Sequence, residues 1–162
     1  MLGSEQDAIA DGHGQDIRIM TPEPNETCEL CASPGGAVLH TEPLCRVVLV
    51  ADADYPAFCR VILNRHAREM TDLDSVERQR LMAVVFAVER ALRETLRPDK
   101  INLASFGNMT PHVHWHVIPR WRDDRHFPQP VWGCAQRAQP VRHPATPELG
   151  AAIAAALAMA AA

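Results

Sequence analysis

The sequence has no excess of basic residues: 16 lysines and arginines stand against 20 aspartates and glutamates, and the net charge is -4. A protein that binds a nucleic-acid backbone normally presents a basic stripe, because it must replace the counterions condensed on the phosphates. The composition therefore argues against a nucleic-acid polymer as partner. A small phosphorylated ligand remains compatible, since a few local hydrogen-bond donors suffice to bind it.

Long apolar runs are also missing. No segment reaches the roughly 18 to 20 apolar residues that a membrane span requires, so we expect no membrane association. The first twenty residues contain acidic side chains and no continuous apolar stretch, which does not fit a secretory signal. The five cysteines are an odd number without the spacing of a small disulfide scaffold, which favours a reduced, cytoplasmic protein.

The chain length of 162 residues allows one domain with a sizeable core. Residues 1–27 are polar and contain Gly, Pro and acidic residues, so we expect a flexible arm there. The folded core is expected at 28–133. Residues 134–162 are expected to form a C-terminal extension, whose alanine-rich end predicts a peripheral or frayed helix.

Five short apolar segments predict strands, at 37–40, 45–50, 58–63, 101–106 and 112–118. Between the third and the fourth, apolar residues recur every three or four positions over 75–96, which predicts an amphipathic helix. Asp74 and Glu77 predict an acidic capping box at its start, and Pro98 ends it. This order of elements predicts an α+β fold, with a mostly antiparallel sheet of about five strands and one long helix on one face.

Residues 112–118 read His-Val-His-Trp-His-Val-Ile. On a strand, alternate side chains project together, so His112, His114 and His116 would line one face while the apolar residues between them enter the core. A helix would instead scatter the three imidazoles around its axis. Burying three such rings is costly unless each is hydrogen-bonded or ligated, so the pattern predicts a functional role.

Two chemistries fit three clustered imidazoles. In the first, the histidines hold a catalytic zinc ion that keeps one position open for water. In the second, one imidazole attacks phosphorus while its neighbours orient it and bind phosphoryl oxygens. Imidazole is a competent nucleophile near neutral pH because its ordinary pKa is about 6.5. The residues alone leave both open.

The run His112-Val-His114-Trp-His116-Val-Ile-Pro-Arg120 resembles the signature of the histidine-triad (HIT) superfamily. The resemblance extends over 28–133, and its surroundings are similar to bacterial members described as diadenosine-tetraphosphate-hydrolase-like. It implies a two-fold homodimer with joined sheets and a small-molecule nucleotide as ligand. The implied activity is hydrolysis of dinucleoside polyphosphates or nucleoside phosphoramidates. The alternative is a nucleotide-binding HIT protein with little turnover.

The same resemblance assigns roles to individual residues. It makes His114 the nucleophile, which forms a transient nucleotidyl-phosphohistidine, with His112 and His116 completing the catalytic triad and His116 bonded to a phosphoryl oxygen. Asn102 and Asn108 fall at positions that contact the phosphate or the leaving group. These roles suit a transition state that mainly needs positioning and donors for the equatorial oxygens.

Two positions depart from the family pattern. Asp52 falls where members often carry Asn, and a carboxylate there would prefer ribose hydroxyls to phosphate oxygens. Met109 stands where members place a hydroxyl, and it cannot protonate a leaving group. The nearest hydroxyl is that of Thr110.

Cys28 and Cys31 have the spacing that lets two thiolates share a tetrahedral metal. By the same resemblance, His66 and His112 would complete a closed Cys2His2 set, so the metal would be a structural zinc. No organic cofactor is implied. The alternative is a pair of buried thiols, with His112 acting only as a hydrogen-bonded neighbour of the catalytic residues.

The segment after the triad contains further candidates. Arg120, Arg122 and Arg125 could attract an anionic ligand, or they could belong to a solvated charged loop together with the two aspartates among them. Trp132 could cover an adenine, cover a dimer seam, or simply pack.

Overall fold

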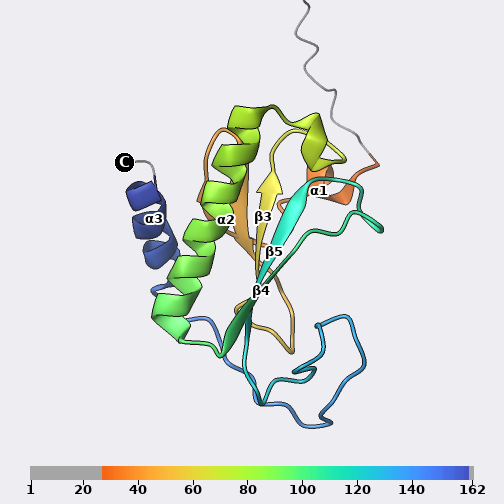
Figure 1. Ribbon diagram of the computed structural model, residues 1–162, viewed down its shortest axis with the longest axis vertical. Helices are drawn as coiled ribbons and strands as arrows, with labels where there is room; N and C mark the ends of the chain where they lie inside the picture. Colours follow the sequence, from red (N-terminus) through yellow and green to blue (C-terminus); the bar gives the residue numbers. More distant parts are fainter. Residues whose placement is uncertain (1–26, 161–162) are drawn as a thin grey trace, which may run out of the picture.

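The computed structural model describes residues 27–160, so the predicted N-terminal arm lies outside the described residues except for Thr27. Five antiparallel strands form one sheet in the order β1-β2-β3-β5-β4 (Figure 1). The strands are Ala37–Thr41 (β1), Cys45–Leu49 (β2), Cys59–Leu63 (β3), Lys100–Ala104 (β4) and His114–Arg120 (β5). The helical elements are Glu29–Ala32 (α1), the 3-10 turn Met70–Asp72 (η1), Ser75–Leu96 (α2) and Leu149–Ala160 (α3). The predicted α+β class is confirmed.

The long helix α2 covers one face of the sheet, with α3 beside it (Figure 1). It begins and ends as predicted: the Glu77 amide donates to Asp74 Oδ1 (2.8 Å), and the Asp74 amide donates to Glu77 Oε2 (3.1 Å). Its last residue is followed by Arg97 in the left-handed conformation, just before Pro98. The main core lies between this helix and the sheet.

The C-terminal helix α3 is confirmed as a helix, but the prediction that it is peripheral or frayed was wrong. Leu149, Ile153 and Leu157 recur every four residues and are buried in the main core. Because alanine favours a helix in any surroundings, the composition of this segment did not show where the helix packs. The three larger side chains were the available signal.

The opposite face of the sheet carries α1, whose Leu30 packs against Val48 and Ile62. The turn at Pro34–Gly36 follows α1, and Gly36 has a φ of 154°. A Cβ atom at Gly36 would lie 2.4 Å from the Leu49 carbonyl oxygen, so only glycine fits this close approach. None of the helices within 27–160 is long and apolar enough to cross a membrane.

Candidate active site and metal centre

A pocket of about 410 Å³ lies on the face of the sheet opposite α2. The central strands supply Arg60 from β3 and both His114 and His116 from β5. Glu29 of α1 forms part of one wall, and the connection between β4 and β5 forms another. The alternation predicted for the triad therefore brings the second and third histidines together.

His114 is held in one tautomer by the backbone. Its Nδ1 lies 2.7 Å from the carbonyl oxygen of His112, and because a carbonyl can only accept, Nδ1 must carry the proton. The other ring nitrogen, Nε2, is then unprotonated in the neutral ring. Burial lowers the pKa of His114, which keeps this nitrogen available as a nucleophile at neutral pH.

His116 stands perpendicular to His114, with ring centroids 4.8 Å apart. Burial, reinforced by the neighbouring His114 and Arg60, lowers the pKa of His116 to about 3. Its Nδ1 is buried and has no hydrogen-bond partner within the described part of the chain. His116 is therefore a neutral ring with an unsatisfied polar atom.

Aromatic side chains surround His116. Its ring centroid lies 5.3 Å from that of Phe58, 6.3 Å from that of Phe106 and 5.0 Å from that of Trp132. Phe106 and Trp132 also contact each other edge to face, with centroids 4.8 Å apart. Of the roles considered for Trp132, the structure thus shows a position on the pocket wall, where both aromatic residues are about half exposed.

Only some of the other residues predicted to bind the ligand lie in the pocket. Asn108 and Thr110 line the pocket, as does Met109. Asn102 does not: it lies on β4 and its Oδ1 accepts from Arg120 Nη1 at 2.6 Å. Asp52 is also outside the pocket, and its Oδ1 accepts from the amides of Asp54 and Tyr55 in a tight turn, at 2.9 and 3.0 Å.

Sequence reasoning missed four residues of the pocket wall: Glu29, Leu30, Arg60 and Phe106. Arg60 carried a signal, because it is a charged residue within the apolar segment 58–63. The register of β3 against β5, which places Arg60 opposite His116, could not be obtained from either segment alone.

Arg120 is neither an anion-binding group nor part of a solvated loop, so both interpretations of it were wrong. Its Nε donates to Asp124 Oδ2 at 2.6 Å, and both side chains are 2% exposed. Its Nη2 donates to the Gln129 carbonyl at 2.9 Å, which ties down the segment leading to Trp132. Tyr55 completes the network by donating its hydroxyl to Asp124 Oδ1.

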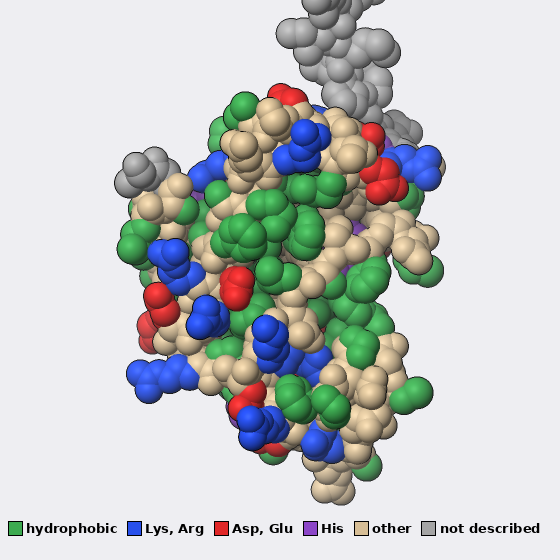
Figure 2. Space-filling view, viewed as in Figure 1, with side chains coloured by type: hydrophobic (Ala, Val, Ile, Leu, Met, Phe, Trp, Pro, Cys, Tyr) green, Lys and Arg blue, Asp and Glu red, His purple; other side chains and the backbone are tan. Residues whose placement is uncertain are grey.

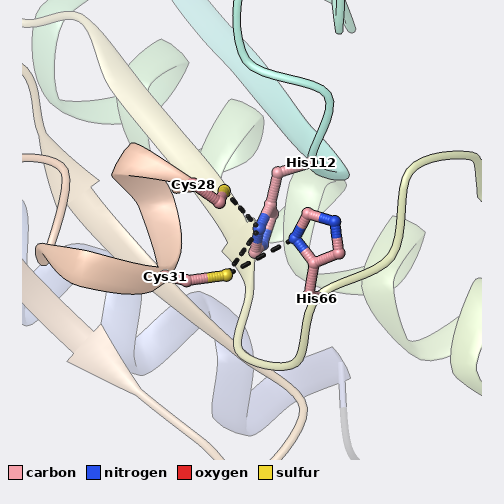
Figure 3. A group of neighbouring side chains, drawn as sticks. All are labelled: Cys28, Cys31, His66 and His112. Atoms are coloured by element: carbon pink, nitrogen blue, oxygen red, sulfur yellow. Dashed lines mark hydrogen bonds between the residues drawn. The ribbon is translucent and has the colours of Figure 1, made fainter. Parts of the chain in front are cut away.

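The second cluster comprises Cys28, Cys31, His66 and His112, whose ligand atoms all lie within 4.8 Å of one another. Figure 3 shows these side chains converging from α1 and the residue that caps it, from the segment after β3 and from the segment just before β5. The sulfur-to-nitrogen distances are 3.4 to 3.5 Å. Ordinary zinc bond lengths in a tetrahedral site give about 3.5 Å for this distance. The four residues could therefore hold a zinc ion in a closed site.

His112 faces this cluster and does not line the pocket. Its Nε2 donates to the Leu63 carbonyl at 2.8 Å, which leaves Nδ1 directed at the two cysteines with a free lone pair. Burial lowers the pKa of His112, which favours the neutral, ligating form. A catalytic zinc on the three histidines would lack this third ligand, so the geometry does not support it.

The comparisons with known proteins agree with this arrangement. The sequence model of the HIT domain matches residues 35–123, more than half of the chain. The chain belongs to the HIT domain family. In the curated proteins it matches the AP-4-A phosphorylase of Mycobacterium tuberculosis, with 31% identity over 78 residues. That match covers 44% of this chain and 40% of the relative, so it spans less than half of the relative's length.

Solved structures of HIT proteins resemble the chain over most of its length. A histidine triad protein from Bradyrhizobium japonicum has a TM-score of 0.60 and 36% identity, covering 78% of this chain and 90% of its own. One from Marinobacter aquaeolei also has a TM-score of 0.60, with 31% identity and coverage of 83% and 94%. A zinc-bound family protein from Mycobacterium smegmatis shares the fold at 24% identity, with a TM-score of 0.54 and coverage of 82% and 94%.

Proposed function

We propose that this HIT protein cleaves nucleotide phosphoanhydride bonds, as in dinucleoside polyphosphates of the diadenosine tetraphosphate type, through a covalent intermediate on His114. The observation that carries the proposal is the tautomer of His114, whose Nδ1 proton is committed to the His112 carbonyl at 2.7 Å. Membership in the HIT family and the AP-4-A phosphorylase relatives support it.

In the first step, His114 Nε2 forms a bond to the α-phosphorus, and the bond from that phosphorus to the bridging oxygen breaks. The polyphosphate leaves with the electron pair. In the second step, an acceptor displaces His114 from the phosphorus. If the acceptor is water, diadenosine tetraphosphate yields AMP and ATP; if it is inorganic phosphate, the products are ADP and ATP. The roles of the residues around His114 follow from their positions.

Two residues of the pocket wall, His116 and Met109, are poor proton donors at neutral pH. The pKa of His116 is lowered to about 3, so its ring stays neutral, and Met109 has no acidic proton. A polyphosphate can depart without being protonated, whereas the amine of a phosphoramidate must gain a proton. We therefore expect diadenosine tetraphosphate to be cleaved faster than adenosine phosphoramidate, which is the second substrate class.

The decisive experiment compares wild type with His114→Ala and with the matched control His40→Ala. Incubation with diadenosine tetraphosphate should release mononucleotides from wild type and the control, and activity should fall at least about 1,000-fold in His114→Ala. Mass spectrometry of quenched wild type should show an added adenylyl group. Undiminished turnover in the folded His114→Ala protein would exclude the covalent mechanism.

A binding protein with little turnover is the other outcome of this experiment. It would hold if the wild type binds AMP but cleaves no member of a panel of dinucleoside polyphosphates and phosphoramidates. In that case His114, His116 and Asn108 would serve only as ligand contacts. Asn102 and Asp52 lie outside the pocket, and Oδ1 of each is engaged in a hydrogen bond.

We also propose that Cys28, Cys31, His66 and His112 bind a structural zinc ion. Bound there, the metal would crosslink α1 to the start of β5 and supply stabilisation of the fold. The chain itself positions the site, since Arg46 Nη2 donates to the Leu30 carbonyl at 2.6 Å and fastens α1 to β2. His112 contributes to the reaction through its carbonyl group, which sets the His114 tautomer.

A homodimer with joined sheets is the assembly that we propose. Strand β4 lies at the edge of the sheet and could pair with a second copy. A hollow of about 580 Å³ runs along β4, from Glu89 of α2 to Trp132. Phe86 of α2 is 53% exposed, and Figure 2 shows hydrophobic side chains gathered in the middle of this face.

The remaining proposals concern boundaries and location. We propose 28–133 as the catalytic domain and 134–162 as its extension, which adds α3 to the same core. No disulfide bond joins the cysteines within residues 27–160, which fits a reducing compartment, and we propose the cytoplasm.

A further inference from the structure

Arg60 differs from the other arginines that are withdrawn from solvent. Within residues 27–160 it is the one arginine classed as buried or half-buried whose side chain makes no hydrogen bond or ion pair. The others bind carboxylates or backbone carbonyls: Arg46, Arg65, Arg78, Arg80, Arg120, Arg125 and Arg137. Arg60 Nε in particular is buried without a partner.

Arg60 lies in the same pocket as the proposed nucleophile. Arg60 of β3 is the direct register partner of His116 of β5 and lines the same pocket as His114. Its guanidinium carbon lies 5.7 Å from the centroid of the Phe58 ring, which in turn packs against His116. The carboxylates of Glu29, on the pocket wall, and of Asp52 attract the charge of Arg60, but neither lies within ion-pair distance of it.

The unpartnered polar atoms concentrate in this pocket. Of the buried side-chain atoms without a hydrogen-bond partner in the described residues, Arg60 Nε and His116 Nδ1 both belong to residues that line it. Such groups cost free energy unless a ligand satisfies them. A guanidinium and a ring nitrogen beside a nucleophilic histidine match the oxygens of a phosphoryl group, for which arginine has a favourable fork geometry.

We propose that Arg60 binds a non-bridging oxygen of the phosphoryl group that His114 attacks, and that it makes the pocket specific for phosphorylated nucleosides. The inference rests on the proposed function, because it takes a nucleotide as the ligand. As the His114–phosphorus bond forms and the bridging oxygen departs, Arg60 remains paired with the oxygens that carry the charge. Arg60 thereby supplies the cation that the arginines after the triad do not supply.

Calorimetric titration of the full chain with AMP and with adenosine tests the inference without requiring turnover. Arg60→Gln should weaken AMP binding by about 10- to 100-fold, the loss expected for a charge-assisted hydrogen bond, and change adenosine binding by less than about twofold. Arg93→Gln removes the same charge from an exposed position on α2 and should change neither. Arg60→Lys, which keeps the charge but loses the fork, should fall between wild type and Arg60→Gln.

The outcomes for Arg60 and for the proposed function are distinguishable. A wild-type chain that binds AMP more tightly than adenosine but cleaves nothing would retain the role of Arg60 while the hydrolase proposal fails. Equal weakening of AMP and adenosine in Arg60→Gln and Arg60→Lys would show that Arg60 only shapes the pocket, and would overturn the inference. Unchanged AMP affinity, or a wild type that binds AMP no better than adenosine, would overturn it as well.

Discussion

At the scale of single residues, the site depends on histidines that are kept neutral by burial. His114 and His116 are each about 5% exposed, and burial is the largest cause of the lowered pKa in both. A neutral imidazole has one nitrogen lone pair with which it can attack an electrophile or accept a hydrogen bond. A protonated imidazole has no such lone pair and can only donate hydrogen bonds. The burial that prepares these rings for chemistry also makes the fold sensitive to acid.

We expect His116 to destabilise the protein as the pH falls. Its pKa is about 3 in the folded chain, whereas a histidine in the unfolded chain has a pKa of about 6.5. Below about pH 6 the unfolded state therefore binds a proton that the folded state does not, and the free energy of unfolding falls by about 1.4 kcal/mol per pH unit down to about pH 4. The stability that His116 contributes is thus complete above the unfolded pKa and is lost in acid.

Urea unfolding of the metal-free protein at pH 7 and pH 4.5 provides the measurement. Replacing His116 with Phe keeps an aromatic ring among the surrounding aromatic side chains but removes the titrating group. The variant should therefore lose less stability than wild type between the two pH values. Chelator must be present throughout, because the cysteine and histidine cluster would add its own acid dependence. The same pH dependence in both proteins would show that His116 is not the group responsible.

At the scale of elements, local patterns predicted the fold well. The bounds of α2 agree with the prediction, and each predicted strand overlaps an observed one. Apolar periodicity and capping residues are properties of short segments, so they can be recognised in the sequence alone. The pairing of Arg60 with His116 joins segments far apart in the chain, and no local pattern encodes it.

The site was predictable only where a motif marked it. The alternating histidines identified His114 and His116, and the spacing of Cys28 and Cys31, together with the family resemblance, identified the metal cluster. Asn102 could not be placed, because its side chain accepts from Arg120, a partner that only the tertiary fold brings near. Asp52 instead caps a local turn through the amides of Asp54 and Tyr55, and the family resemblance did not anticipate that role.

The exposed edge of β4 and the adjoining face of α2 make a prediction about assembly. A dimer formed across them would cover Phe86, which is exposed in the single chain. In Phe86→Glu the dimer would have to bury an unpaired charge, so the variant should be a monomer. Val76→Glu is the matched control, since Val76 is 72% exposed near the start of the same helix. Light scattering after size-exclusion chromatography measures both. A wild-type monomer, or a dimer that survives Phe86→Glu, would contradict the assembly.

At the scale of the whole molecule, the cluster of Cys28, Cys31, His66 and His112 brings α1 next to the start of β5. We expect about one zinc per chain, lost on Cys28→Ser, with a fall in Tm of roughly 10 °C as several kcal/mol of metal-linked stability disappear. Cys134→Ser changes an exposed thiol outside the cluster and should alter neither. Metal analysis and thermal unfolding give both quantities. Retention of zinc in Cys28→Ser would contradict the ligand set.

Between the two cysteines lie only Glu29 and Leu30, and both of these line the nucleotide pocket. One turn of backbone therefore borders two different ligands, so the occupancy of one should bias the affinity for the other. Thermodynamic reciprocity requires that whatever factor zinc adds to AMP affinity, AMP adds to zinc affinity. Nucleotide supply in the cell would then change how firmly such a protein holds its metal, by that same factor.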